Sequence, residues 1–271
     1  MKRAAEKLTG ASVRGVKRVL TAGIALGQGA LDCVYPRVCA GCGACDDSVR
    51  GRALCPVCAD SAARVPSPVC NCCGIPITHP SGQGVCSVCL TERQYIRHCR
   101  SIFVYDGDTP LARAILAFKH GGTAGLAIDF AELMAAQLPA AASASDWDLL
   151  VAVPIHASRF RQRGYNQAQL LAGQLGKRLG VPSPAAVLLR QRATPPQHGS
   201  RAQRRRNVRG AFAVRRTAQV KDKRILLIDD VLTTGATLRE CARMLLNAAA
   251  ASVDALTLAR VLRRSAPSQR S

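Results

Sequence analysis

The cysteines of this chain constrain its fold more than any other feature, because twelve of the thirteen lie between Cys33 and Cys99. Eight of them form two copies of one pattern, in which a C-x-x-C pair is followed by a second such pair. The offset between the copies is 31 residues throughout, so that Cys39, Cys42, Cys55 and Cys58 correspond to Cys70, Cys73, Cys86 and Cys89. A fixed internal offset of this kind indicates a duplicated structural unit.

The spacing within each copy is typical of a metal site. A C-x-x-C turn places two thiolates side by side, and the glycine that follows it, Gly43 or Gly74, permits a tight turn. Two such turns supply the four sulfurs that hold structural zinc in a tetrahedron. Redox-active pairs and iron–sulfur ligation are alternatives, but four pairs in a strict duplicate favour zinc. We therefore predict two structural Zn²⁺ ions, which this region needs for order because it has little apolar mass.

The other cysteines of the region lie outside the repeat. We expect Cys33, Cys45, Cys72 and Cys99 to be free thiols. The alternative is that Cys45 or Cys72 replaces a neighbouring cysteine as a metal ligand. His79 lies in the long loop of the second copy and is expected to be solvated.

The first residues of the chain argue against export. Basic residues are distributed along "MKRAAEKLTGASVRGVKRVL", and "VLTAGIALGQGAL" is too short and too rich in glycine to cross a bilayer. We expect no signal peptide and no membrane span. The expected location is cytoplasmic, where thiols stay reduced and cysteine clusters usually bind metal.

Beyond Cys99 the chain alternates between strand and helix patterns. Strands are predicted at 101–106, 148–154, 224–229 and 252–260, and helices at 109–122, 125–138, 165–180 and 236–250. A short antiparallel pair is predicted from 186–192 and 210–214. This alternation predicts an α/β fold with a parallel sheet flanked by helices. The predicted organisation is a basic extension at 1–32, a Cys-rich domain at 33–98, the α/β domain at 99–262 and a disordered tail at 263–271.

The positive charge predicts an anionic partner. The formal net charge is +21, which suits nucleic acid or a phosphorylated ligand, although a host proteome rich in arginine would produce the same excess. The charge is dense between Arg190 and Arg224, where twelve Lys or Arg residues accompany a single acid, Asp222. We expect a mobile cationic loop there. A lid over an anion is favoured over a solvated linker, because the segment lies between two strands of one sheet.

The stretch "ILLIDDVLTTGAT" joins the best strand of the chain to a predicted ligand site. In a parallel sheet, ligands bind at the carboxyl ends of the strands, which is where Asp229 and Asp230 are expected. A loop of small residues and hydroxyls then leads into a helix, whose first N–H groups bind phosphate well. Carboxylates beside a phosphate cradle predict a phosphorylated sugar as the ligand.

Two other strand motifs end in acids. A Walker B strand does so, but no G-x-x-x-x-G-K-[ST] motif precedes it here. A response-regulator pocket draws its acids from separate strands and has no use for the Thr-Thr-Gly-Ala-Thr run.

These residues resemble a known family. "ILLIDDVLTTGAT" is similar to the phosphoribosyl-pyrophosphate (PRPP) motif of type I phosphoribosyltransferases, and "VAVPIHASRFRQRGYNQAQLLA" and "RQRATPPQHGSRAQRRRNVRGAF" strengthen the likeness. With the Cys-rich region read as a double zinc ribbon, the chain resembles the ComF family of competence-associated, amidophosphoribosyltransferase-like proteins from about residue 31 to 260. The resemblance implies a type I phosphoribosyltransferase-like parallel sheet that is preceded in the chain by a small double zinc-ribbon domain.

The resemblance assigns roles by position. It implies that Asp229 and Asp230 bind the ribose hydroxyls, and that the 5′-phosphate is held by Thr233, Thr234, Gly235, Ala236 and Thr237. Arg159 and Arg163 correspond to the pyrophosphate loop, and the flexible hood over the sugar corresponds to Arg192, Thr194, Gln197 and Arg201. Catalysis would rest on Asp229, Asp230, Arg163 and Arg192, with Mg²⁺ bridging pyrophosphate and ribose oxygens. Lys119 lies where the family carries a lysine, or is an ordinary charge at a helix end.

The family implies partners as well as a ligand. It is associated with natural competence and the handling of incoming single-stranded DNA, which implies DNA and a helicase of the competence machinery as partners. Amide transfer from glutamine is not expected, because the chain starts Met1-Lys2 without a cysteine nucleophile or a glutaminase domain. Three functions remain: a PRPP-binding competence protein, a phosphoribosyltransferase for a small base or amine, and a zinc-ribbon nucleic-acid adaptor with a vestigial sugar site. The sequence does not name an acceptor.

Overall fold

A computed structural model describes most of the chain. The described residues are 38–45, 49, 52–78, 84–138, 146–193 and 201–262. His79, Cys33, Thr194, Gln197 and the predicted tail at 263–271 lie outside them. For Arg201 and Arg205 only the backbone is described.

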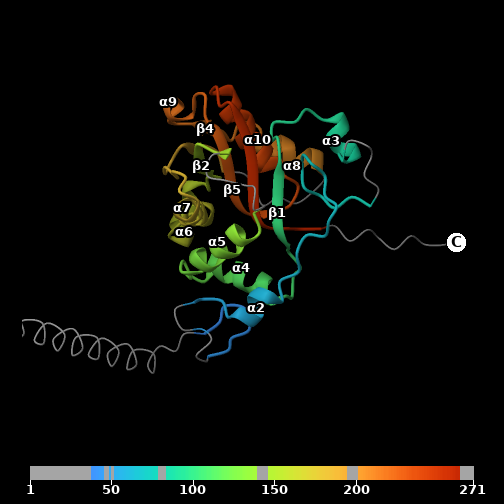
Figure 1. The fold of residues 1–271 in the computed structure, drawn as a ribbon. Helices are drawn as coiled ribbons and strands as arrows, with labels where there is room; N and C mark the ends of the chain where they lie inside the picture. Colours follow the sequence, from blue (N-terminus) through green and yellow to red (C-terminus); the bar gives the residue numbers. More distant parts are fainter. Residues whose placement is uncertain are drawn as a thin grey trace, which may run out of the picture.

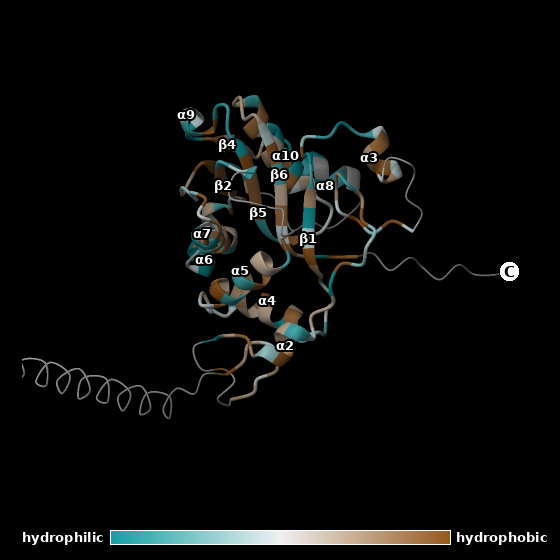
Figure 2. Ribbon diagram, viewed as in Figure 1, coloured by the Kyte–Doolittle hydropathy of each residue, from teal (hydrophilic) through white to brown (hydrophobic). Residues whose placement is uncertain are grey.

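The described residues build a four-stranded parallel sheet in the order β1-β6-β5-β2 (Figure 1). Its strands are β1 (Cys99–Val104), β2 (Leu149–Ala152), β5 (Arg224–Leu232) and β6 (Ser252–Arg260). In register, Leu227 of β5 lies between Val151 of β2 and Ala255 of β6. The central strands are covered on both faces, so they read as continuous aliphatic runs rather than alternating ones. Figure 2 shows the resulting hydrophobic colour along β5.

Helices surround this sheet (Figure 1). They include α4 (Pro110–His120), α5 (Leu126–Ala136), α7 (Gln167–Leu179) and α10 (Ala236–Asn247). Thr109 caps α4 with its side chain, and Pro110 occupies the first turn. Helix α7 packs on β2 and β5, while α10 packs on β5 and β6. The predicted parallel α/β class is therefore confirmed. Among the described residues, no helix has both the length and the apolar content to span a membrane.

Several short helices were not predicted, among them α6 and α8. Helix α6 (Ala157–Arg163) has no buried residue, and its sequence has no apolar period that would reveal a helix. At the start of this helix, the His156 side chain accepts a hydrogen bond from the Ser158 N–H. Helix α8 (Arg201–Val208) lies in the segment expected to be a mobile loop, and that expectation is wrong for these residues. It packs on α10, and only Val208 at its end is fully buried among its described side chains.

The region around α8 contains further short elements. The predicted antiparallel pair is confirmed as β3 (Leu188–Arg190) and β4 (Phe212–Val214), and a one-turn helix, α9 (Thr217–Val220), follows. Strand β5 also runs three residues further than expected, to Leu232, because β6 continues beside it. Asp229 and Asp230 therefore both lie inside β5, shortly before its carboxyl end.

The two halves of the cysteine repeat lie on different parts of the molecule. We call residues Cys39–Cys58 the first cysteine unit and residues Cys70–Cys89 the second. The first unit includes α2 (Pro56–Asp60), which lies beside α4. The second includes the start of α3 (Ser87–Thr91), which Figure 1 places at the upper right, away from α2. The repeat is therefore not one compact body.

Candidate functional site

The eight repeated cysteines gather into two clusters of four. The sulfur atoms of Cys39, Cys42, Cys55 and Cys58 lie within 4.8 Å of one another, as do those of Cys70, Cys73, Cys86 and Cys89. Zn–S bonds of about 2.3 Å put the sulfurs of a tetrahedral site roughly 3.8 Å apart. The Cys42–Cys55 Sγ distance is 3.9 Å, and the equivalent Cys73–Cys86 distance is 3.7 Å. Both clusters therefore fit a zinc ion.

The backbone favours the thiolate form of the first cysteine in each cluster. The Sγ of Cys39 accepts hydrogen bonds from the N–H groups of Gly41 and Cys55, at 3.4 and 3.3 Å. Burial raises the pKa of Cys39, but the backbone hydrogen bonds outweigh it and hold the pKa at about 6. The same balance holds the pKa of Cys70 at about 6. Thiolates are the form that zinc binds, so the turns prepare their ligands for metal.

The cysteines outside the repeat stay outside the clusters. Of those that the structure describes, Cys45 is exposed, Cys72 is half-buried and Cys99 is buried. None of the three belongs to either group of four.

The two aspartates of the PRPP-like motif lie next to a lysine. Nζ of Lys119, at the end of α4, is 3.2 Å from the Asp230 carboxylate, and both side chains are mostly buried. Burial raises the pKa of Asp229 to about 8, and the neighbouring Asp230 carboxylate adds to the rise. Two adjoining carboxyl groups share one cation here, so hydrogen bonds from hydroxyl groups or a further cation would stabilise their negative charge. Lys119 thus belongs to this site and is not merely a charge at a helix end.

Polar contacts fix the backbone that carries Lys119. The carbonyl of Phe118 accepts hydrogen bonds from the Tyr165 hydroxyl at 2.7 Å and from Nε2 of Gln167 at 3.2 Å. Nδ2 of Asn166 donates to the Val153 carbonyl at 3.0 Å. The run Tyr165–Gln167 therefore ties the end of α4 to the end of β2. Sequence reasoning noted these residues within a family motif but gave them no such role.

Arginines complete one side of the site. Arg163 donates from Nη1 to Oε1 of Gln167 at 3.2 Å, while its buried Nε has no partner within the described structure. Burial lowers the pKa of Arg163, and the Asp230 carboxylate opposes that shift. Arg163 and Arg159 line a cavity of about 150 Å³ together with Lys119, Asp229 and Asp230.

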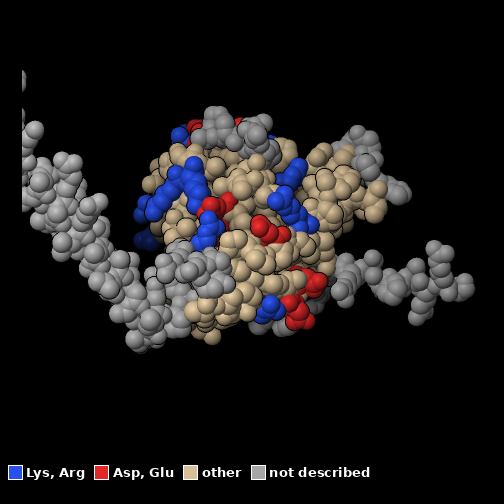
Figure 3. Space-filling view, turned by 60° about the horizontal axis from the view of Figure 1, so that its bottom comes forward, with Lys and Arg blue, Asp and Glu red and all other residues tan. Residues whose placement is uncertain are grey.

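A second cavity adjoins the first. Its volume is about 400 Å³, and the two cavities share Arg159, Asp229 and Thr237 in their walls. Arg204 of α8 also lines it, with a buried Nε that has no partner among the described atoms. Figure 3 shows blue cationic side chains on both sides of red acidic ones on the face it presents. Arg190 of β3 lines the smaller cavity; neither it nor Arg204 was predicted as a site residue.

The larger cavity reaches a loop that we call the Thr-Gly loop (Thr233–Gly235), at the start of α10. Gly235 has φ +75°, a conformation that strains other residues, and no side chain caps the helix there. The hydroxyl of Thr234 is buried and has no partner in the described structure. Uncapped N–H groups, an unpartnered hydroxyl and nearby guanidinium groups together suit an anion. Ala236 and Thr237 lie in the first turn of α10 and line the same cavity.

The predicted hood is brought to the site only in part. Nη2 of Arg192 donates to the carbonyls of Asn207 and Arg209, at 3.0 and 3.1 Å, so this side chain holds the end of α8. Arg192 is not in the wall of either cavity. Arg201 begins α8, with no described side chain, and Thr194 and Gln197 lie outside the described residues. The structure therefore assembles the acids, Lys119, Arg159, Arg163 and the Thr-Gly loop.

Comparison with known proteins agrees with both halves of this picture. Residues 164–270 match the phosphoribosyl transferase domain family, and residues 30–96 match the double zinc ribbon domain family. The DNA utilization protein YhgH of Salmonella typhimurium is 33% identical over 77% of this chain and 91% of its own length. Competence protein ComFC of Bacillus subtilis is 28% identical over 76% and 84%, and competence protein F of Haemophilus influenzae is 35% identical over 42% and 50%. The chain belongs to the ComF family, with a double zinc ribbon and a phosphoribosyltransferase domain.

Proposed function

We propose that this protein binds PRPP with Mg²⁺ across the two adjoining cavities. One observation carries the proposal: the pair Asp229 and Asp230, with Lys119, lies in one continuous cleft with the Thr-Gly loop. A simple phosphate needs no carboxylates beside it. A sugar that bears a 5′-phosphate and a pyrophosphate uses the anion loop, the acids and the cations together.

Each part of the cleft suits one part of this ligand. The Thr-Gly loop and Arg204 would hold the 5′-phosphate, because Thr233, Gly235 and Arg204 line the larger cavity. Asp229 and Asp230 would accept hydrogen bonds from the ribose hydroxyls. Arg159 and Arg163, which line the smaller cavity, would hold the pyrophosphate. Mg²⁺ would neutralise part of the charge on the pyrophosphate and ribose oxygens.

The same arrangement favours departure of pyrophosphate. Lys119 and Arg163 place positive charge where negative charge would grow on the leaving group, and fixed charges of this kind stabilise a transition state. The Phe118 carbonyl contacts keep Lys119 in place during this change. We therefore retain phosphoribosyl transfer as the reaction class, with no acceptor assigned.

Isothermal titration calorimetry with PRPP and Mg²⁺ tests the assignment. Asp230→Asn removes a carboxylate that accepts sugar hydroxyls, and losing a charged hydrogen bond costs about 1.5–3 kcal/mol, or roughly ten- to a hundredfold in affinity. The matched control is Asp60→Asn, which changes an exposed acid on α2. Equal PRPP affinity in Asp230→Asn and wild type would refute the assignment of the acid pair.

We further propose that the protein handles incoming single-stranded DNA in the cytoplasm, with a competence helicase as a partner. Two kinds of observation support this role. Relatives carry the names DNA utilization protein and competence protein. Arg206 and Arg209 are exposed in or just after α8, the helix whose Arg204 lines the larger cavity, in a chain of net charge +21. Phosphate contacts from such arginines need no base sequence.

A labelled oligonucleotide titrated at several salt concentrations tests DNA binding. Counterion release predicts a slope of about −0.7 in log affinity per phosphate contacted. Replacing Arg206 and Arg209 by Ala should flatten the slope and leave PRPP affinity unchanged, since Arg204 is the α8 side chain in the cavity wall. DNA binding without PRPP binding would favour the nucleic-acid adaptor. PRPP binding without DNA binding would favour a phosphoribosyltransferase for a small base or amine.

A further inference from the structure

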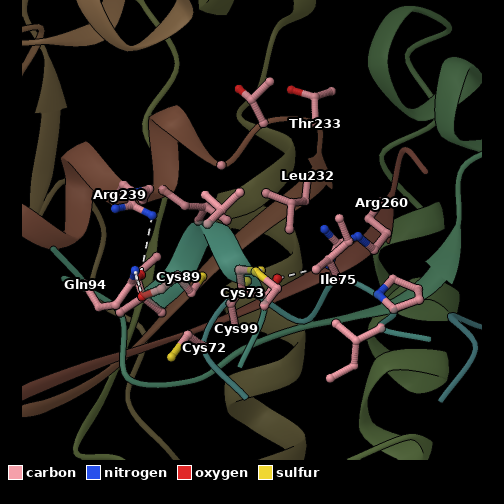
Figure 4. A pocket seen from close by; sticks show the side chains of 18 of the residues that line it. Cys72, Cys73, Ile75, Cys89, Gln94, Cys99, Leu232, Thr233, Arg239 and Arg260 are labelled. Atoms are coloured by element: carbon pink, nitrogen blue, oxygen red, sulfur yellow. Dashed lines mark hydrogen bonds between the residues drawn. The ribbon is translucent and has the colours of Figure 1, made fainter. Parts of the chain in front are cut away.

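The second cysteine unit lies directly behind the Thr-Gly loop. A cavity of about 240 Å³ separates them, with Cys73, Cys86 and Cys89 in one wall. Leu232 and all three residues of the loop form the opposite wall. Figure 4 shows Leu232 pointing towards Cys73 and Cys99, whereas Thr233 points away from them. Leu232, Thr233 and Gly235 also line the larger ligand cavity, so the loop is a thin partition between the cysteine unit and the candidate site.

Arg239 joins the second unit to the helix that follows the loop. This residue lies one turn into α10, and its Nη2 donates to the Arg93 carbonyl at 2.6 Å. Its Nη1 is 3.1 Å from the Glu92 carboxylate and 3.4 Å from Oε1 of Gln94. The Glu92 and Arg239 side chains are only 22% and 19% exposed. Glu92–Gln94 follow directly on α3, which carries the cluster residue Cys89.

Arg260 makes a second connection. It is 5% exposed, at the end of β6, and its Nη1 donates to the Cys73 carbonyl at 3.0 Å. The N–H of the next residue, Val261, donates to the Leu232 carbonyl at 2.9 Å. The end of β6 thus contacts the second cluster on one side and the residue before the Thr-Gly loop on the other.

The first cysteine unit has a different neighbour. Nε of Arg113 donates to the Gly41 carbonyl at 2.7 Å, which attaches the unit to α4. The N–H groups of Ala53 and Leu54 donate to the Asp129 carboxylate of α5, at 2.7 and 3.1 Å. Arg113 lies near the start of α4, six residues before Lys119, and Asp129 lies on α5.

We infer that the second cysteine unit positions the Thr-Gly loop, with Arg239 as a positioning residue, so that metal in this unit sets the affinity for the sugar phosphate. The inference rests on the proposed function for its ligand. Zinc bound to the four cysteines of this unit would hold them together, and would so fix the nearby acceptors that Arg239 reaches. With those acceptors fixed, the first turn of α10 and its N–H donors stay aligned before the phosphate arrives. Binding then loses less free energy to the ordering of the loop.

Arginine variants test the inference without touching a metal ligand. Arg239→Ala should retain two zinc ions yet bind PRPP–Mg²⁺ about tenfold more weakly by calorimetry, because the loop loses a charged hydrogen-bond anchor. Amide hydrogen exchange in residues 231–238 of the ligand-free protein should speed up. Arg239→Lys, which still reaches a carboxylate or a carbonyl, should recover most of both effects. Arg113→Ala is the matched control at the first unit and should bind PRPP within about twofold of wild type.

The outcomes separate the two proposals. If Arg239→Ala equals wild type in affinity and exchange, or if Arg113→Ala weakens PRPP binding as much, the inference is wrong. If wild type does not bind PRPP, the proposed function fails, and hydrogen exchange in the loop still decides whether Arg239 positions it. If Arg239→Ala does not fold, Glu92→Gln takes its place in the same comparison. This variant removes only the negative charge that pairs with Arg239.

Discussion

The two cysteine units have the same chemistry but different neighbours. Each has the same ligand spacing, sulfur distances that fit zinc, and a first cysteine whose pKa the backbone holds near 6. The first unit rests on helices α4 and α5. The second contacts the end of β6, and the residues that directly follow it contact the start of α10. The duplicated sequence therefore forms two similar metal sites. Because the two units pack on different elements, we expect only the second to affect the cleft.

The largest expected difference between the units appears when a metal ligand is removed. Cys42→Ser and Cys73→Ser change equivalent positions of the repeat, and each should lower the zinc content from two ions to one by elemental analysis. Structural zinc contributes about 10–16 kcal/mol to order in small zinc peptides, so each loss should loosen its own unit. Cys73→Ser should weaken PRPP binding at least about tenfold, whereas Cys42→Ser should leave it within about twofold. Equal loss of affinity in the two variants would contradict the distinction drawn between the units.

A smaller difference is expected at the glycine after each first C-x-x-C pair. Gly43 and Gly74 both have positive φ, +76° and +67°. A Cβ on Gly43 would meet nothing within 4 Å, but a Cβ on Gly74 would lie 2.4 Å from the Cys99 carbonyl oxygen. Gly43→Ala should cost about 1–2 kcal/mol for the backbone conformation alone. Gly74→Ala should cost roughly 1–3 kcal/mol more, because β1 must shift.

Urea denaturation of the two zinc-loaded variants measures this difference. Gly74→Ala should also lower PRPP affinity, since it displaces the unit behind the Thr-Gly loop. Similar unfolding free energies for the two variants would show that the second unit is not packed tightly on the sheet.

The sequence predicted the parts of this molecule that repeat or alternate. Strand–helix alternation gave the parallel sheet, and the cysteine spacing gave both clusters. It did not predict where each unit docks, because docking depends on single polar residues far along the chain. Asp129 lies 75 or more residues beyond the N–H groups that it accepts, and Arg239 lies 146 residues beyond Arg93. No spacing rule links such pairs.

The candidate site shows the same limit. The two acids lie near the carboxyl end of an unmistakable strand, so their place at that edge of the sheet was predictable. Lys119 was ambiguous in sequence, and only the fold places it 3.2 Å from Asp230. Arg204 was missed because α8 is polar along most of its length, and a helix without an apolar stripe has no period to detect.

Removing Asp129 should detach the first unit at a moderate cost. Its carboxylate is 6% exposed and accepts two backbone N–H groups of that unit. Asp129→Ala leaves both donors buried and unpaired, which should cost about 1–3 kcal/mol. PRPP affinity should not change, because the second unit is untouched. A large fall in affinity would show that both units support the Thr-Gly loop.

The pH dependence of Asp129→Asn refines this prediction. Burial raises the pKa of Asp129 above 3.8, and the N–H donors only partly offset that rise. A raised pKa means that the folded protein favours the neutral acid, so ionisation removes stability as pH rises through the folded pKa. Asp129→Asn keeps an oxygen acceptor without the charge. Its unfolding free energy relative to wild type should therefore rise with pH from about 3.8 upward, and a falling difference would contradict the burial argument.

The smallest expected difference lies in the ion pairs of the two units. Arg52 and Glu132 at the first unit are 3.9 Å apart and about half exposed, at 46% and 43%, and Glu132 has a second partner in Arg178 at 3.2 Å. Arg239 and Glu92 at the second unit are 3.1 Å apart and far less exposed. Double-mutant cycles to Ala, measured by urea denaturation, should give a coupling energy of about 0–0.5 kcal/mol for the first pair and roughly 1 kcal/mol or more for the second. Salt at about 1 M, where the Debye length falls to about 3 Å, should abolish the first coupling and only reduce the second. Equal couplings would mean that the Arg239–Glu92 pair behaves as an ordinary surface ion pair, which would contradict the positioning role of that contact.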